Sequence, residues 1–132
     1  MNPMREQIRS LLRVESRDGG FSALLHVDPK LAVLSDHFQG FPLLPGMCMI
    51  QAVVLAGAIR QGAPDLYVRR LKYAKFTQPV RPGEQLVIEA DMTASSPGEF
   101  TIKAFLSIGD RRCAEISLTT GIVTKVESRA RP

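Results

Sequence analysis

The segment of residues 47–59, with the sequence MCMIQAVVLAGAI, most constrains what this chain can fold into. It follows the pair Pro45-Gly46, has the length of an ordinary helix, and contains one polar residue, Gln51. A helix that is apolar on every face has to be buried on all sides. The segment is too short to span a bilayer, which takes about 20 apolar residues. We therefore expect a helix from Pro45-Gly46 to about Arg60 that the rest of the chain surrounds.

The remaining sequence mostly has the pattern of β-strands. Residues 100–108 alternate between apolar and mostly polar positions, which is the period of a strand with one buried face. Turn-forming residues, such as those at 96–98, separate segments of this kind. An antiparallel sheet curved around the single buried helix satisfies this order, because the sheet then buries one face against the helix. The predicted fold class is α+β, with strands at residues 21–27, 66–76, 85–93, 100–108 and 112–124.

The N-terminal residues predict a second, short helix. Asn2 is a favourable N-cap and Pro3 suits the first helical turn, and this helix is expected to end before the turn-rich residues 16–20. Residues 1–132 have the length of one domain, in which residues 125–132 form a charged tail that is expected to fray. Because no apolar signal segment opens the chain, we expect a cytoplasmic protein.

Charge and cysteine content argue against several classes of function. The net charge is +4, and the sequence lacks a basic stripe interleaved with aromatic residues, so nucleic acid is not an expected partner. A membrane span is not expected either. Cys48 and Cys113 lie far apart in apolar surroundings, without the spacing of metal ligands. We expect two buried free thiols and no metal site.

The loop before the apolar helix contains the candidate catalytic residues. His37 lies in a segment stiffened by glycine and proline, and Gly46 begins the helix nine residues later. Histidine titrates near neutral pH and suits a general base. The first N–H groups of a helix can stabilise a carbonyl oxygen that gains negative charge. Gln51, a polar side chain in an apolar helix, is expected to face a cavity, a water or a partner chain, because an unpaired buried amide is costly.

Residues 37–46, HFQGFPLLPG, resemble the H-F-x-G-x-P-x-x-P-G signature of the 3-hydroxyacyl-acyl-carrier-protein dehydratases (FabZ- and FabA-like proteins with the hotdog fold). Residues 75–86, KFTQPVRPGEQL, are similar to the family's K-F-x-x-P-V-x-P-G-D-x-L. The resemblance covers residues 22 to about 123. Two departures stand out: the family's usual R-Y-P-F-L-L-V-D opening is absent, and Gln51 occupies the position of the family's Glu or Asp. A short start of this kind also occurs in dehydratase-like proteins of polyketide and aryl-polyene pathways.

The resemblance implies a role for each matching residue. His37 would abstract the C2 proton of a 3-hydroxyacyl thioester, and the N–H of Gly46 would bind the thioester carbonyl. Gln51 would reach the site from a second subunit and hold the leaving hydroxyl. As an amide, Gln51 forms hydrogen bonds but has no acidic proton to transfer. His37 would then serve both proton transfers.

Other residues have weaker assignments. Phe38, Met47, Met49 and Phe76 are candidates for binding the acyl chain, with ordinary core packing as the alternative. Four basic residues, Arg69, Arg70, Lys72 and Lys75, are candidates for docking an acidic carrier protein, with a solvated strand surface as the alternative. No separate cofactor is expected, because the phosphopantetheine of acyl carrier protein, or coenzyme A, carries the substrate.

Three functions remain open from the sequence. The first is dehydration of 3-hydroxyacyl thioesters on acyl carrier protein to trans-2-enoyl thioesters, in fatty-acid or polyketide/polyene-type synthesis. The second is a non-catalytic acyl-binding or partner subunit of a dehydratase complex, which Gln51 favours. The third is a hotdog thioesterase. We expect a homodimer or a higher oligomer of dimers.

Overall fold

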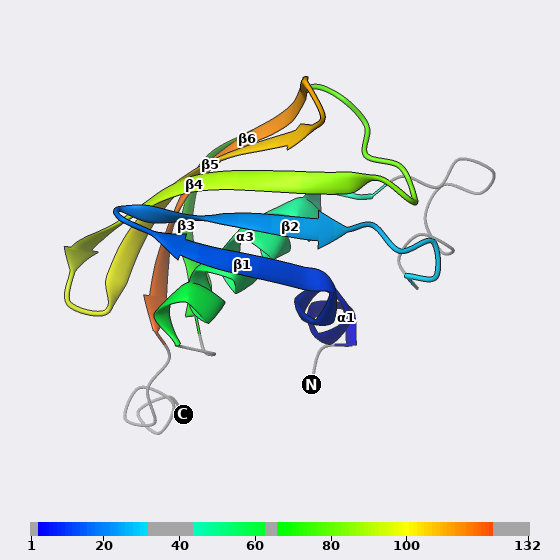
Figure 1. The fold of residues 1–132 in the computed structure, drawn as a ribbon. Coiled ribbons are helices and arrows are strands. Elements are labelled where there is room, and N and C mark those ends of the chain that lie inside the picture. Colours follow the sequence, from blue (N-terminus) through cyan, green and yellow to red (C-terminus); the bar gives the residue numbers. More distant parts are fainter. Residues whose placement is uncertain (1–2, 32–43, 63–65, 123–132) are drawn as a thin grey trace.

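The computed structural model describes residues 3–31, 44–62 and 66–122. In this part of the chain, one six-stranded sheet curves around the helix α3 (Figure 1). The elements are, in chain order, α1 (Pro3–Leu11), β1 (Leu12–Arg17), β2 (Gly20–His26), α3 (Gly46–Gln61), β3 (Leu66–Phe76), β4 (Gln85–Ser96), β5 (Glu99–Ile108) and β6 (Arg111–Ile122).

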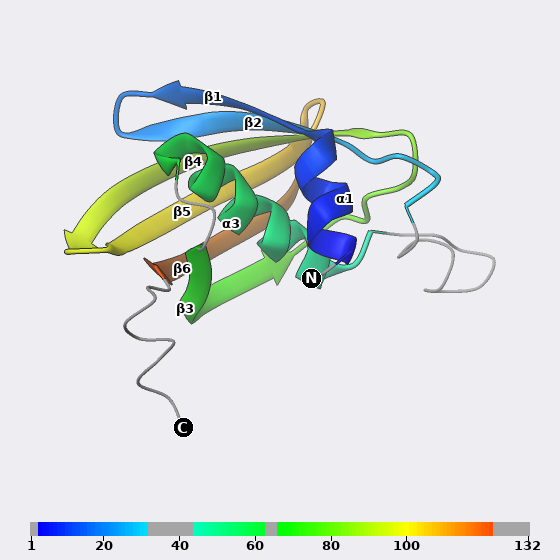
Figure 2. The same ribbon diagram turned by 90° about the horizontal axis from the view of Figure 1, so that it is seen from below.

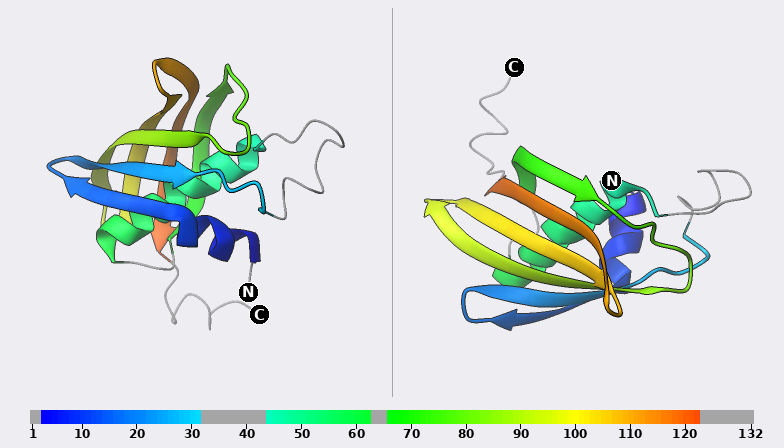
Figure 3. Two further views of the ribbon diagram at one scale, coloured as in Figure 1. Left: turned by 45° about the vertical axis from the view of Figure 1, so that its right-hand side comes forward. Right: turned by 90° about the horizontal axis from the view of Figure 1, so that it is seen from above.

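The sheet has the strand order β1-β2-β4-β5-β6-β3, and every neighbouring pair is antiparallel. β1 and β3 are therefore its two edges. The helix α3 crosses the concave face, and α1 lies beside the first turns of α3 (Figure 2). The other views show how strongly the strands bend around the helix (Figure 3). The predicted α+β architecture, a curved antiparallel sheet wrapped around one long buried helix, is confirmed.

The core forms where the inward side chains of the sheet meet α3. Alternate residues of the central strands are at most 1% exposed, namely Leu86, Ile88, Ala90, Ile102, Ala104 and Leu106. The helix is buried at Cys48–Ile50 and from Ala52 to Ala58. Gly57 allows close contact with β5, because a Cβ at this position would lie 2.9 Å from Ile102 Cδ1. A helix enclosed in this way needs no polar face, as the sequence predicted.

The N-terminal region differs from the prediction. The helix α1 ends at Leu11, and β1 begins at once and pairs with β2 from Leu12–Leu25 to Arg17–Gly20. The helix therefore ends before the turn-rich residues 16–20, as predicted, but the prediction missed the strand between them. Most side chains of β1 are exposed, so this edge strand has little of the buried alternation that identifies a strand in a sequence. Its pairing with β2 decides its conformation.

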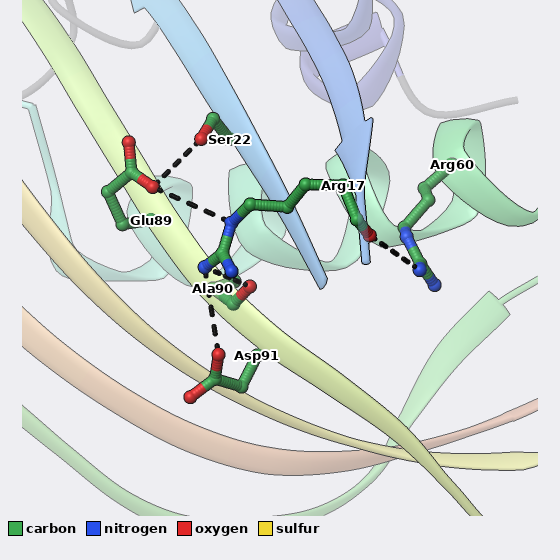
Figure 4. Close-up of polar contacts among 6 residues, drawn as sticks. All are labelled: Arg17, Ser22, Arg60, Glu89, Ala90 and Asp91. Carbon is green, nitrogen blue, oxygen red and sulfur yellow. Dashed lines mark hydrogen bonds and ion pairs between the residues drawn. The ribbon is translucent and has the colours of Figure 1, made fainter. Parts of the chain in front are cut away.

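Polar contacts fasten the end of β1 to the sheet (Figure 4). Arg17 donates a hydrogen bond to the carbonyl oxygen of Ala90 at 3.0 Å and forms ion pairs with Glu89 at 3.8 Å and Asp91 at 3.6 Å. Arg60, in the last turn of α3, donates to the carbonyl oxygen of Arg17 at 3.1 Å. Exposed ion pairs contribute little stability, so these contacts mainly fix where β1 ends.

The other predicted strands agree with the structure within a few residues, and β3 agrees at both ends. The last strand ends at Ile122, and the predicted frayed tail lies outside the described residues. Among the described residues, no helix is long and apolar enough to cross a membrane.

Candidate functional site

The candidate site lies at the start of α3. Pro45 precedes the helix with extended backbone angles (φ −63°, ψ 149°), and the first turn contains no acidic residue. The N–H groups of Cys48 and Met49 donate to the carbonyl oxygen of Pro45 at 2.9 and 3.3 Å. The N–H groups of Gly46 and Met47 come before these, where a helix has no intrahelical acceptor to offer. Together with the helix dipole, they suit binding of a partly negative oxygen.

The ring of Phe76, at the end of β3, lies against Gly46. A Cβ added to Gly46 would lie 2.7 Å from Phe76 Cζ and 2.8 Å from Cε2, so a side chain at position 46 would collide with the ring. Phe76 is 45% exposed and the neighbouring Met47 is 62% exposed. The start of α3 therefore presents a backbone glycine between two accessible apolar side chains. Met49, by contrast, is buried in the core.

The two segments that resemble the dehydratase motifs contact each other. Besides the contact of Gly46 with Phe76, the N–H of Leu44 donates to the carbonyl oxygen of Val80 at 2.8 Å. On the N-terminal side of residues 32–43, Val27 donates to the carbonyl oxygen of Glu84 at 3.0 Å, and Gly83 donates to that of Val27 at 2.7 Å. Residues on both sides of the segment that contains His37 are thus hydrogen-bonded to the segment at residues 75–86. His37 and Phe38 themselves lie outside the described residues.

Gln51 is half-buried and has a partner within its own chain. Arg5, on α1, donates a hydrogen bond from Nη1 to Gln51 Oε1 at 3.4 Å. The helix α1 is anchored there by Ile8, which is fully buried, and by Met4, whose Sδ lies 3.5 Å from Cys48 Sγ. The sequence suggested a cavity, a water or a partner chain for Gln51, and the structure shows that Arg5 binds its oxygen. Sequence reasoning missed Arg5, because nothing in the local pattern of α1 indicates which residue of α3 it meets.

Two titratable groups near the site have altered acidity. Burial raises the pKa of the Cys48 thiol, so this thiol stays protonated at neutral pH. Tyr73, on β3, donates a hydrogen bond to Glu115 at 2.9 Å, and this bond raises the pKa of the tyrosine hydroxyl. As predicted, Cys48 and Cys113 are buried and free. Neither the Cys48 thiol nor the Tyr73 hydroxyl is poised to act as a base at neutral pH.

The four basic residues predicted to dock a carrier protein are exposed on β3, an edge strand. Arg69 forms an ion pair with Glu99 at 3.4 Å, and the ammonium of Lys75 lies 5.5 Å from the centre of the Tyr73 ring. These residues lie on the strand that ends at Phe76, so the charged surface leads to the start of α3.

His26 lies at the end of β2, on the outward side of the sheet. The buried residues of β2 are Phe21, Ala23 and Leu25, whereas His26 belongs to the alternate, outward set. Its Nδ1 lies 2.6 Å from Nε2 of Gln85. The pocket that it lines has a volume of about 390 Å³, with Ser10, Leu11, Arg13, Leu24 and Gln85 as the other lining residues.

The model of the ApeI-like family, described as ApeI dehydratase, matches residues 13–114, most of the chain. This chain belongs to the ApeI-like dehydratase family. The resemblance to acyl-carrier-protein dehydratases that the sequence motifs indicated is therefore confirmed.

Curated relatives of this ApeI-like protein are FabZ 3-hydroxyacyl-acyl-carrier-protein dehydratases. The chain is 29% identical to the Symbiobacterium thermophilum enzyme over 107 residues, which are 76% of this chain and 75% of that protein. It is 27% identical to a Wolbachia enzyme over 95 residues. The latter match spans 67% of this chain but 66% of the relative, slightly less than two thirds of its length.

Solved structures establish the hotdog fold for this ApeI-like protein. The dehydratase heterocomplex ApeI:P from Xenorhabdus doucetiae matches with a TM-score of 0.64 and 24% identity, over 83% of this chain and 94% of that one. A hypothetical thioesterase with coenzyme A from Streptococcus pneumoniae matches with a TM-score of 0.65 and 12% identity, over 89% and 90% of the two chains. At these identities, both likenesses concern the fold alone.

Proposed function

We propose that this ApeI-like protein dehydrates 3-hydroxyacyl thioesters carried by acyl carrier protein to trans-2-enoyl thioesters, in fatty-acid or polyketide/polyene-type synthesis. The observation that carries the proposal is the contact between the two motifs at Gly46 and Phe76. It brings together the start of α3, whose N–H groups suit an oxyanion, and an accessible apolar ring that suits an acyl chain. Family membership and the FabZ relatives support dehydration over other reactions of thioesters.

The reaction needs two proton transfers and no change of redox state. His37 takes a proton from C2 of the substrate while the N–H of Gly46 stabilises the negative charge on the thioester oxygen. The C3–O bond then breaks, the C2=C3 double bond forms, and the hydroxyl leaves as water with the proton that His37 returns. Gln51 holds the leaving hydroxyl by hydrogen bonding. A general acid usually contributes about 10²–10⁴-fold to the rate, so a site with an amide here is expected to be slow.

The proposed active unit is a homodimer, in which Gln51 of one protomer completes the site of the other. β3 is a sheet edge, it is 11 residues long, and its Leu71 is 44% exposed. Long edge strands with exposed apolar side chains are surfaces that pair with another chain. The neighbouring Arg70 and Lys72 would receive the acidic carrier protein beside this interface.

A spectroscopic assay tests the proposed reaction. The purified protein is incubated with 3-hydroxyacyl thioesters of several chain lengths on acyl carrier protein and on coenzyme A, and enoyl absorbance is followed. We expect slow enoyl formation, faster with the carrier protein. Absence of turnover in both the dehydration and the hydration direction, with folded dimeric protein, would rule the proposal out.

A second candidate function is that of a non-catalytic partner subunit. The observation in its favour is Gln51 itself, since an amide stands where the family has a carboxylate. The Xenorhabdus structure, a dehydratase heterocomplex, provides a precedent for unlike subunits. This candidate predicts that the protein alone is inactive, yet stimulates an active homologue with which it co-elutes.

A further inference from the structure

The contact between Arg5 and Gln51 determines what position 51 can do. We propose that Arg5 is a positioning residue: it orients the Gln51 amide with its NH2 group available to the substrate, and it would keep any carboxylate at this position ionised. The catalytic consequence rests on the proposed dehydration. The electrostatic consequence does not, so the two can be tested separately.

The chemistry of arginine fixes the orientation of the amide. A guanidinium has only donors, so the Gln51 atom that faces it at 3.4 Å has to be the carbonyl oxygen. The reversed amide would place two donors against each other. Both side chains are half-buried, so the contact is partly shielded from solvent. The Gln51 group that faces away from Arg5 is the NH2, which donates hydrogen bonds and accepts none.

The packing of α1 keeps Arg5 in place. Met4 and Ile8 flank Arg5 in the helix, with Met4 next to Cys48 and Ile8 fully buried. Cys48 and Gln51 are three residues apart on α3, which places them on one side of the helix. The same surface of α3 therefore contacts both Met4 and the guanidinium of Arg5 on α1. Arg5 therefore stays within reach of Gln51 while α1 keeps these apolar contacts.

An ordered NH2 group selects the part of the substrate that it can bind. The complementary atom is an oxygen that accepts, such as the hydroxyl oxygen at C3. Gln51 can therefore hold a leaving hydroxyl, and the proton that the hydroxyl needs has to come from elsewhere. In the proposed reaction that source is the imidazole, which then acts as both base and acid.

Arg5 also changes what a carboxylate would do at this position. Burial alone favours the neutral acid, whereas a cation within hydrogen-bonding distance favours the ionised form. Arg5 would form a charge-assisted bond with a glutamate here, and such bonds are roughly twice as strong as neutral ones. The ionised carboxylate has no proton to give. Gln51→Glu should therefore fail to create a general acid while Arg5 is present.

The elements around Gln51 contain other titratable groups, among them Arg9, which is half-buried on α1. On α3, Cys48 is a thiol whose pKa is raised by burial, so it carries no charge at neutral pH. On α1, Glu6 is exposed. The strands packed against the helix contribute apolar side chains to the core there, such as Phe21, Ala23 and Leu25 of β2, Leu12 and Val14 of β1, and Val68 and Ala74 of β3. Among the described hydrogen bonds, the one from Arg5 brings a charged group to Gln51.

The test compares Gln51→Glu with the double variant Arg5→Met/Gln51→Glu. Arg9→Met/Gln51→Glu is the control, because it removes the same charge from the same helix. The acid dissociation constant of the introduced carboxyl group is measured by NMR on carboxyl-labelled glutamate, and its signal is the one that the unsubstituted protein lacks. We expect loss of Arg5 to reduce this constant at least about tenfold, and loss of Arg9 to change it less than about twofold. Equal titration of the introduced carboxyl group with and without Arg5 would overturn the proposal.

Turnover by the same proteins provides the second measurement. Gln51→Glu alone should be slower than the unsubstituted protein, because an ionised carboxylate has no hydrogen-bond donor for the leaving hydroxyl. The double variant should be at least about tenfold faster than Gln51→Glu at neutral pH. A gain of this size in Gln51→Glu alone would contradict the proposed role of Arg5. If every protein is inactive, the proposed dehydration fails while the NMR result still decides the role of Arg5. If circular dichroism shows that the methionine variant is unfolded, Arg5→Gln replaces it, and Arg5→Lys should restore the ionised carboxylate.

Discussion

Gly46 begins α3 directly against the ring of Phe76, with room for a hydrogen atom but not for a methyl group. The glycine belongs to the first dehydratase-like motif and the phenylalanine to the second. The relationship brings the two motifs together at the start of the helix. A substitution at either position therefore changes the same small region.

We predict that Gly46→Ala lowers stability by about 1–3 kcal/mol, the usual cost of overpacking, and reduces turnover. The added methyl group would collide with the Phe76 ring or push α3 away from it. The double variant Gly46→Ala/Phe76→Leu removes the aromatic ring and should recover at least half of the lost stability. Denaturant unfolding measures the stability of the single and the double variant. A fully stable single variant would show that the contact is looser than described.

A dimer is the second prediction. Light scattering at micromolar concentration should give twice the subunit mass of 14.5 kDa. Leu71→Arg places a charge on the exposed apolar position of the β3 edge and should raise the dimer dissociation constant at least about tenfold, or about 1.4 kcal/mol. Lys103→Arg, on the inner strand β5, is the control. A monomer at micromolar concentration would contradict the shared site.

The Cys48 thiol should be unreactive in the folded protein. Its pKa is raised by burial, so less thiolate is present at a given pH than in the unfolded chain. A thiol reagent at about pH 8 should modify native Cys48 at least about tenfold more slowly than denatured Cys48, as followed by mass spectrometry on Cys113→Ala protein. Rapid labelling of the native protein would contradict the burial.

The raised pKa of the Cys48 thiol also predicts how the free energy of unfolding depends on pH. The unfolded chain loses the thiol proton at a lower pH than the folded chain does. The folded state therefore binds more protons above the ordinary thiol pKa, and the free energy of unfolding should fall as the pH rises through that range. Cys48→Ala should make this fall shallower.

The sequence allowed the central helix and most of the sheet to be predicted, because buried positions produce a regular pattern of apolar residues along the chain. Residues 47–59 are apolar on every face, apart from Gln51, and the alternation along β5 identifies its buried side. β1 has no such pattern, since most of its side chains are exposed and its pairing with β2 depends on the tertiary structure. A single sequence therefore indicated five of the six strands, the edge strand β3 among them, and missed β1.

The candidate site was predicted in its composition but not in its contacts. The two motifs indicated Gly46 and Phe76, and their spacing gave no sign that the ring would lie on the glycine. Arg5 was missed because its partner is 46 residues away on another helix, and neither helix pattern specifies that pairing. His37 and Phe38 lie outside the described residues, so their roles stay predictions.

The most direct test of the account is the dehydration rate of His37→Ala beside that of His26→Ala. The sequence contains two histidines, and His26 lies on the outward side of β2, so the second variant controls for loss of an imidazole as such. With 3-hydroxyacyl-carrier protein as substrate, we expect His37→Ala to lose at least about 10²-fold in turnover while its thermal unfolding is unchanged. His26→Ala should stay within about twofold of the unsubstituted protein. If folded His37→Ala retained the full rate, His37 would not be the base, and the proposed dehydration mechanism would be wrong.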